Sequence, residues 1–203
     1  MYVIAFDFET AGGCIQKNGF VRLGAVAFDV KNGTVLTEFD GWTSMEGYEW
    51  EERCLNEFWK KKENESMYEE ALKMTEKSVY TPYQVVDNFV HWVKIIAATV
   101  GHDDIILISD NVAFDGALLR AFASIDIMYI FGSYRDMVDV SNVYYGISRK
   151  MVGTKLLDTS SFGGALQSLG ISEQPTFDVV HDHNPVNYAT LIAKKWAYVM
   201  KLL

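Results

Sequence analysis

The chain has 203 residues and a mass of 23.0 kDa, with 49% hydrophobic and 22% charged residues, proportions typical of one globular domain. Its two cysteines have no metal-type spacing, which excludes a disulfide scaffold and a zinc finger and indicates a cytoplasmic protein. The 18 basic and 27 acidic residues give a formal charge of −9, which argues against binding a duplex through many phosphate contacts. An enzyme whose own carboxylates hold metal ions stays compatible with this charge, because the ions then face the phosphate.

Targeting and membrane segments are not predicted. No apolar run approaches the roughly 20 residues that span a bilayer. Asp7 interrupts the N-terminal apolar run before it reaches the length of a signal-peptide core. The chain has no repeat, no low-complexity tract and no linker, so we expect a single domain over residues 1–203.

The first third of the chain predicts a three-stranded meander. Residues 2–8 are apolar or aromatic up to the acidic end of the run, as in a strand buried on both faces. Two further β-rich runs, 20–30 and 34–42, flank Lys31-Asn32-Gly33. An Asn-Gly pair between such runs is a strong hairpin signal.

The rest of the chain predicts mainly helices. Thr81-Pro82 supplies an N-cap and a proline at the first helical position, and Asn184-Pro185 does the same near the end. In chain order, the expected elements are helices at 49–62, 66–77 and 82–100, a strand at 105–109, a helix at 117–122, a strand at 127–131, and helices at 138–145, 161–169 and 185–203. This order predicts an α/β fold in which a mixed sheet, an antiparallel meander plus parallel strands, is flanked by helices.

Asp7 and Glu9 lie two residues apart on the first predicted strand, so both side chains point to the same face. Two carboxylates at this spacing can bind one cation. A solvated strand end is the alternative interpretation. However, two like charges on a strand that is hydrophobic on both faces are costly unless a cation or hydrogen bonds compensate. The pair therefore predicts a metal site.

Two motifs resemble those of a known family. The run Asp7-Phe8-Glu9-Thr10, followed by the predicted strand pair, resembles the first motif of the DEDD 3'-5' exonucleases. The second motif of that family is an Asn, a short spacer and Phe-Asp at a strand-to-helix turn, and Asn111-Val112-Ala113-Phe114-Asp115 is similar to it. Asp115 is then the third carboxylate. If Asp115 were only a helix N-cap, the helix dipole would explain an acidic residue there. It would not explain why that residue follows a buried strand.

The last motif of the DEDDh subgroup, the relatives of ribonuclease T, is a histidine, four residues, an aspartate and usually an alanine. The run from His183 to Ala189 is similar to it, except that Tyr188 stands in place of the aspartate. His181 is a rival for the histidine, but its fifth successor, Val186, is a poorer match. The length and the motifs most resemble phage or viral members of the subgroup, which implies the host cytoplasm.

The resemblance implies a ribonuclease-H-like fold and hydrolysis of the 3'-terminal phosphodiester with two Mg²⁺ or Mn²⁺ ions. It implies that Asp7 bridges the ions, that Glu9 completes the first site and that Asp115 holds the second. It also implies that His183 is the general base, a role suited to a side chain with an unperturbed pKa near 6.5.

Tyr188 departs from the family pattern, because a neutral phenol is a poor ligand for a hard cation. Asp182 in the preceding loop could supply the missing oxygen, and so could Asn184, one helical turn earlier. A degenerate copy with weakened metal binding is the third interpretation. Such a protein would bind a nucleic-acid 3' end without cutting it.

The expected substrate is the 3' end of a single strand rather than a duplex, because basic patches are scarce in the chain. DNA is slightly favoured over RNA. The resemblance places Thr10, Ala11, Asn111 and Phe114 at the substrate, with Phe114 as the ring that stacks on a base. Three further aromatic residues, Trp42, Tyr48 and Trp50, either stack on bases or pack in the core.

Overall fold

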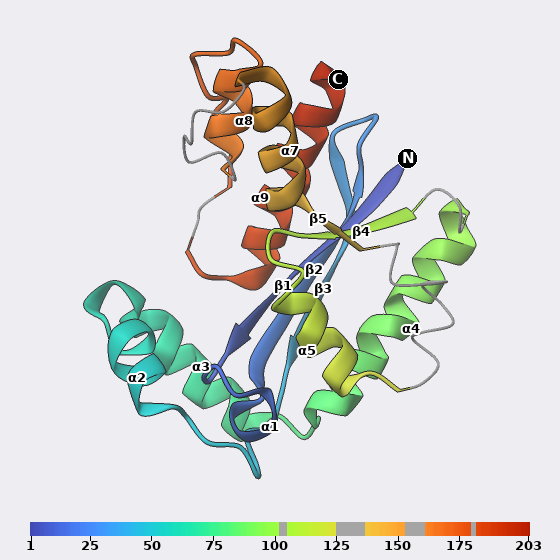
Figure 1. Ribbon diagram of the computed structural model, residues 1–203. Helices are drawn as coiled ribbons and strands as arrows, with labels where there is room; N and C mark the ends of the chain where they lie inside the picture. The colour runs from blue at the N-terminus through green and yellow to red at the C-terminus, as the bar shows by residue number, and fades with distance from the viewer. Residues whose placement is uncertain (102–104, 125–136, 153–160, 180–181) are drawn as a thin grey trace.

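The computed structural model describes residues 1–101, 105–124, 137–152, 161–179 and 182–203. Their strands form one sheet in the order β3-β2-β1-β4-β5 (Figure 1). The strands are β1 (Tyr2–Thr10), β2 (Phe20–Asp29), β3 (Thr34–Trp42), β4 (Ile105–Ser109) and β5 (Met137–Asp139). The helices are α1 (Ile15–Asn18), α2 (Glu52–Cys54), η1 (Leu55–Trp59), η2 (Lys62–Asn64), α3 (Glu65–Lys77), α4 (Pro82–Val100), α5 (Asp115–Phe122), α7 (Val140–Val152), α8 (Phe162–Ser168) and α9 (Pro185–Leu202). The predicted mixed sheet flanked by helices is confirmed.

The antiparallel part of the sheet is the predicted meander, β1 to β3. The turn between β2 and β3 holds Gly33 at φ 73°, a conformation that suits glycine. Its N–H donates to the Asp29 carbonyl at 2.8 Å, and the Asp29 carboxylate accepts from the N–H of Lys31 at 2.9 Å. On the other side of β1, the strand β4 runs parallel to it, as β5 does to β4. Both parallel strands therefore end at the same edge of the sheet as β1.

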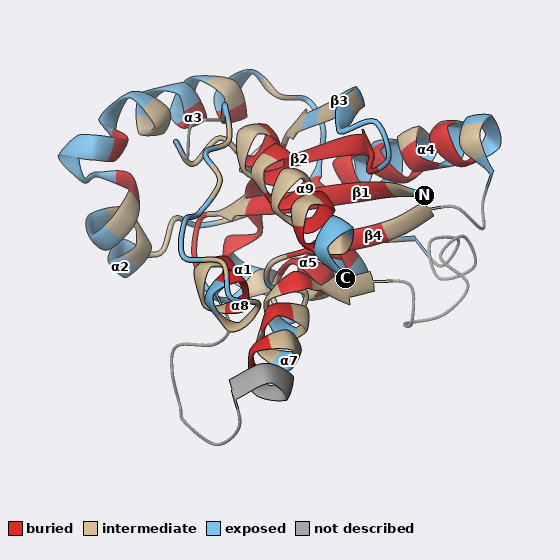
Figure 2. Cartoon of the chain, turned by 90° about the horizontal axis from the view of Figure 1, so that it is seen from above, coloured by how far each residue is buried: buried red, intermediate tan, exposed pale blue. Residues whose placement is uncertain are grey.

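Helices cover both faces of the sheet. Ile4 and Phe6 point to the face covered by α4 and α5, whereas Val3 and Ala5 point to the face covered by α7, α8 and α9. Figure 2 shows the buried residues concentrated on the central strands, with α9 crossing over β1 and β2. Because side chains alternate along a strand, Asp7 lies on the α9 face.

The start of α9 packs directly on the sheet at Gly24. A Cβ at this position would lie 2.3 Å from the backbone N of Val186 and 2.4 Å from the carbonyl carbon of Pro185, closer than real contacts allow. Gly24 is also the β2 residue that pairs with Asp7 of β1. The missing side chain therefore lets the first turn of α9 lie against the strand position beside Asp7.

Three local predictions need correction. The continuous helix expected at 49–62 is broken into α2, the π-helical η1 and the 3₁₀ turn η2. Trp59 explains the break, because its indole N–H donates to the carbonyl of Thr10 at 2.9 Å while the ring is buried. The helix expected at 138–145 begins later, after the unpredicted short strand β5, and α1 was also not predicted. The strand expected at 127–131 lies outside the described residues. In the described part of the chain, no helix is long and apolar enough to cross a membrane.

Candidate active site

Three carboxylates meet at the carboxyl ends of the parallel strands β1 and β4. Asp7, Asp110 and Asp115 each place an oxygen so that these atoms all lie within 4.8 Å of one another. The last pair of the β1–β4 ladder is Ala5 with Ile108, and Asp7 and Asp110 each follow two positions later. The register therefore explains why these two side chains are neighbours.

Asp115 is the first residue of α5 and reaches the cluster through the tight turn after β4. Its carboxylate accepts a hydrogen bond from the hydroxyl of Ser109, whose oxygen accepts in turn from the N–H of Asn111 at 3.0 Å. The Asn111 carbonyl accepts from the N–H of Asp115 at 2.8 Å, which closes the turn. Asp115 is 2% exposed and Asp7 9% exposed, so two of the three acids are almost sealed from water.

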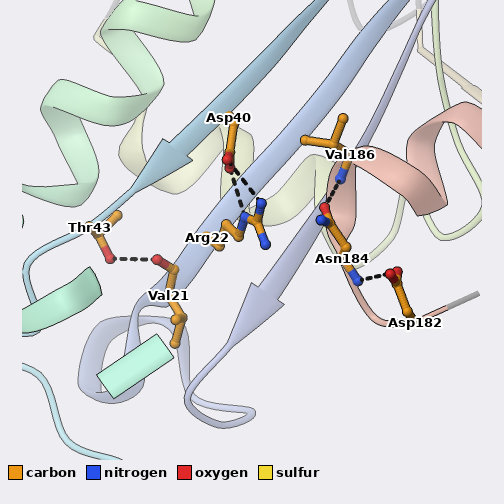
Figure 3. A network of polar contacts seen from close by, with 7 residues as sticks. All are labelled: Val21, Arg22, Asp40, Thr43, Asp182, Asn184 and Val186. Carbon is orange, nitrogen blue, oxygen red and sulfur yellow. Dashed lines mark hydrogen bonds and ion pairs between the residues drawn. The ribbon is translucent and has the colours of Figure 1, made fainter. Parts of the chain in front are cut away.

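Glu9 extends the acidic site along the same face of β1. It pairs with Arg22 of β2, whose guanidinium instead makes two hydrogen bonds to Asp40, at 2.7 and 2.9 Å (Figure 3). The guanidinium also lies 4.3 Å from the centre of the Trp42 ring. Arg22 is thus committed to Asp40 and compensates the charge of Glu9 only in part.

Burial and mutual repulsion keep these acids protonated at higher pH than usual. Burial raises the pKa of Asp7 well above its ordinary range, and the charges of Asp115, Glu9 and Asp110 raise it further. Burial, helped by the charge of Asp115, raises the pKa of Glu9 to about 8. Burial also raises the pKa of Asp115 to about 7, although the Ser109 hydroxyl favours its charged form. The cluster therefore carries its full charge at neutral pH only when a cation compensates.

These shifts predict that stability without metal falls as the pH rises. The folded-state pKa values of Glu9 and Asp115 lie above the ordinary values of 4.5 and 3.8, so the stability that their neutral forms contribute is present below about pH 4 and lost toward about pH 8. A loss of one kcal/mol lowers the melting temperature of a chain of this length by about 2–4 °C. We expect at least this decrease between pH 5 and pH 9 in chelator, and its reversal by Mg²⁺ at pH 9. Calorimetry checks both, with Asp115→Asn expected to flatten the pH profile; a melting temperature that rises with pH would contradict the assignment.

Tyr188 lies in the second turn of α9 and faces the acidic cluster. Its hydroxyl donates a hydrogen bond to the carboxylate of Asp110. Both groups considered as replacements for the missing aspartate are engaged at the start of α9. The amide oxygen of Asn184 accepts from the N–H of Val186 at 3.0 Å, and Asp182 accepts from the N–H of Asn184 at 3.1 Å (Figure 3). Neither belongs to the cluster of three carboxylates, in which Asp110 stands instead.

His183 precedes α9 with φ 56°, a conformation that few residues other than glycine adopt. Its ring packs edge-on against Phe58, with 4.9 Å between the ring centres. Phe58 belongs to η1, and the next residue, Trp59, is hydrogen-bonded to the carbonyl of Thr10 at the end of β1. His183 is therefore held near the strand end that carries the acids. The rival His181 lies outside the described residues.

The predicted substrate residues surround the same strand ends but differ in exposure. Asn111 is exposed and Phe114 half-buried, with part of its ring against the core of α4 and α5. Thr10 is half-buried and its carbonyl accepts from Trp59, whereas the side chain of Ala11 is fully buried, so Ala11 can meet a ligand only through its backbone.

The three aromatic residues at the end of β3 and in the loop after it are packed rather than free. Trp50 lies edge-on against Trp59, with 5.2 Å between the ring centres. Tyr48 covers Gly19, where a Cβ would lie 2.8 Å from the tyrosine ring. Trp42 lies under the guanidinium of Arg22. These contacts favour the core interpretation over base stacking.

Asp110 is the member of the cluster that the sequence interpretation missed. It directly precedes Asn111, so the signal was present as a carboxylate at the end of a predicted buried strand. The parallel register that places it beside Asp7 depends on β1 and β4 being neighbours, which the motifs alone do not specify.

No protein-family model matches the chain, and no curated protein matches it. Solved structures do match. The nuclease domain of 3'hExo, a DEDDh family member bound to rAMP, is 12% identical with a TM-score of 0.61, over 98% of this chain and 92% of that one. Cell-death related nuclease 4 is 13% identical with a TM-score of 0.64, over 98% of this chain and 64% of that one.

A third match is exonuclease I of E. coli in complex with a dT13 oligonucleotide, 12% identical with a TM-score of 0.55. This chain spans 42% of its length. At such identities the likeness establishes the fold, and the acidic cluster lies where the sheet of that fold ends. The chain therefore has the ribonuclease-H-like fold of the DEDDh 3'-5' exonucleases, with a buried acidic cluster of Asp7, Asp110 and Asp115.

Proposed function

We propose that this protein is a metal-dependent 3'-5' exonuclease acting on single-stranded nucleic acid. The observation that carries the proposal is the convergence of Asp7, Asp110 and Asp115 within 4.8 Å at the strand ends of a DEDDh exonuclease fold. Without a cation, packing three acids together in a buried place costs free energy. Bound cations would offset that cost, because their positive charge compensates the three carboxylates.

The donor set fits the metals implied by the fold. Carboxylate oxygens are the ligands that Mg²⁺ and Mn²⁺ prefer, and no sulfur or imidazole belongs to the described cluster. Asp7, Glu9 and Asp115 would hold the ions. When bound, a pair of such ions supplies an activated water and stabilises the departing 3' oxygen.

His183 is the proposed general base, taking a proton from the attacking water. Its place beside Phe58, next to the end of β1, supports this role. Loss of a general base costs about 10² to 10⁴ in rate, so this residue contributes strongly without binding metal.

The proposed substrate is a short single strand with a free 3' end, DNA slightly favoured. Phe114 and Asn111 border the cluster and would contact the terminal nucleotide, by stacking and by hydrogen bonding. Structures with the same fold hold rAMP in one case and dT13 in another. Both RNA and DNA strands should therefore be tested as substrates.

A second candidate function is a protein that binds 3' ends without cutting them. Tyr188 favours it, because this phenol stands where the resemblance expects a carboxylate.

The test is a gel assay on 5'-labelled single-stranded DNA and RNA with Mg²⁺, Mn²⁺ or chelator. We expect stepwise shortening from the 3' end, dependent on metal. Asp115→Asn, purified in parallel, controls for contaminating nucleases and should be inactive. Retention of the labelled strand in a filter-binding assay with no shortening in either metal would favour the binding protein, and shortening that survives in Asp115→Asn would contradict the site.

A further inference from the structure

The candidate site has a carboxylate that the motifs do not account for and lacks one that they imply. Position 188 is a tyrosine, and a neutral phenol is a poor ligand for a hard cation. Asp110 belongs to the cluster although no motif includes it. The two departures are in contact, because the Tyr188 hydroxyl donates to the Asp110 carboxylate.

Asp110 is placed by the backbone of the sheet. It follows β4 at the same distance from the last ladder pair as Asp7 follows in β1, so the parallel register sets the two carboxylates side by side. The ion pairs between described residues involve other acids, namely Glu49, Asp40 and Glu51. Among the described residues, no ion pair reaches the cluster, although Lys195 of α9 lies close enough for the charge of Asp110 to act on its pKa.

The hydrogen bond from Tyr188 orients Asp110. Tyr188 is half-buried, and its ring packs against the core under α9, which limits the movement of its hydroxyl. It is the hydrogen-bond donor to the Asp110 side chain within the part of the chain that is described, and it engages Oδ2. Among the described residues, no hydrogen bond to Oδ1 is found, so this oxygen can face a ligand.

The hydroxyl of a second phenol, Tyr144, is buried where it feels the charge of Asp110. Tyr144 of α7 is 4% exposed, and its hydroxyl has no hydrogen-bond partner among the described residues. The charge of Asp110 is close enough to add to the effect of burial in raising the pKa of this phenol. Buried hydroxyls without a partner are rare and point to a bound water or ion.

We propose that Asp110 is the fourth metal-binding carboxylate of this site, in place of one from position 188, and that Tyr188 is the positioning residue that holds it. The inference rests on the proposed metal-dependent function. In this chain the end of β4 would supply the carboxylate that the family motif places on α9, so the number of acidic ligands would be unchanged.

The test measures Mn²⁺ binding to the full chain by the loss of the free Mn²⁺ signal in electron paramagnetic resonance. We expect Asp110→Asn to weaken binding by at least about tenfold and Tyr188→Phe by about tenfold, the usual cost of removing a partner of a ligand. Combining Asp110→Asn with Tyr188→Asp should restore binding, because the carboxylate returns to the helix. This recovery distinguishes a moved ligand from a merely structural residue.

Asp87→Asn is the matched control. Asp87 is an exposed carboxylate on α4, which covers the opposite face of the sheet, so this variant removes one acidic charge without touching the cluster. Its Mn²⁺ affinity should equal that of the unaltered chain. Unchanged affinity in Asp110→Asn, no recovery in the double variant, or no Mn²⁺ binding by the unaltered chain would each overturn the proposal. If the affinities change as expected while no strand is shortened, Asp110 is a ligand and the proposed exonuclease function fails.

Discussion

Asp7→Asn should lower hydrolysis of a single strand by at least roughly 10³-fold, because it removes a central carboxylate of the cluster that would hold the metal ions, and the transition-state stabilisation that those ions would supply. The same change should raise the stability of the metal-free chain at pH 8. The buried charge of Asp7 is opposed by burial and by Asp115, so a neutral isostere relieves that repulsion. Turnover of 5'-labelled DNA and thermal melting in chelator measure the two effects.

Asp87→Asn is the control for this pair of effects, since Asp87 is an exposed carboxylate on α4, which covers the opposite face of the sheet. It should change neither quantity. An Asp7→Asn variant that melts lower than the unaltered chain in chelator would show that Asp7 is compensated by contacts within the protein. In that case the cluster would not need a cation.

His183→Ala should reduce turnover by about 10² to 10⁴, the usual effect of losing a general base. Mn²⁺ affinity should stay unchanged, because the imidazole is not part of the carboxylate cluster. Single-turnover rates with saturating metal measure the first quantity, and a metal titration measures the second.

The comparison for this prediction is a second histidine variant. His91→Ala, on an exposed position of α4, should leave the rate unaltered. If His183→Ala leaves the hydrolysis rate unchanged while His181→Ala lowers it, the last motif begins two residues earlier than proposed.

Much of the sheet could be predicted from local sequence. The meander follows from alternation and from the Asn32-Gly33 turn, and α4 from Thr81-Pro82, whose capping box the structure confirms. The fold class then followed from the order of the elements. Asp7 and Asp115 could be singled out because each carboxylate stands where a buried strand ends or where the next helix begins.

The remainder depended on contacts between distant segments. Asp110 joins the cluster only through the parallel pairing of β4 with β1, which local periodicity does not encode. The break of the helix expected at 49–62 arises from the hydrogen bond of Trp59 to Thr10, a contact across 49 positions. Short β5 could not be distinguished from the helix that follows it, because three residues are too few to show a period.

The close packing of α9 on Gly24 has a consequence for the order in which the chain folds. Asp7 and Gly24 lie in the N-terminal meander, whereas Pro185 and Tyr188 belong to α9, far along the chain. Contacts between segments so distant in sequence form late in folding, because closing a long loop costs entropy before any contact is gained. Until α9 packs on the sheet, Asp110 lacks the hydrogen bond from Tyr188 and the α9 face of β1 stays open to water. The arrangement of the acidic cluster is therefore completed by one of the last long-range contacts of the fold.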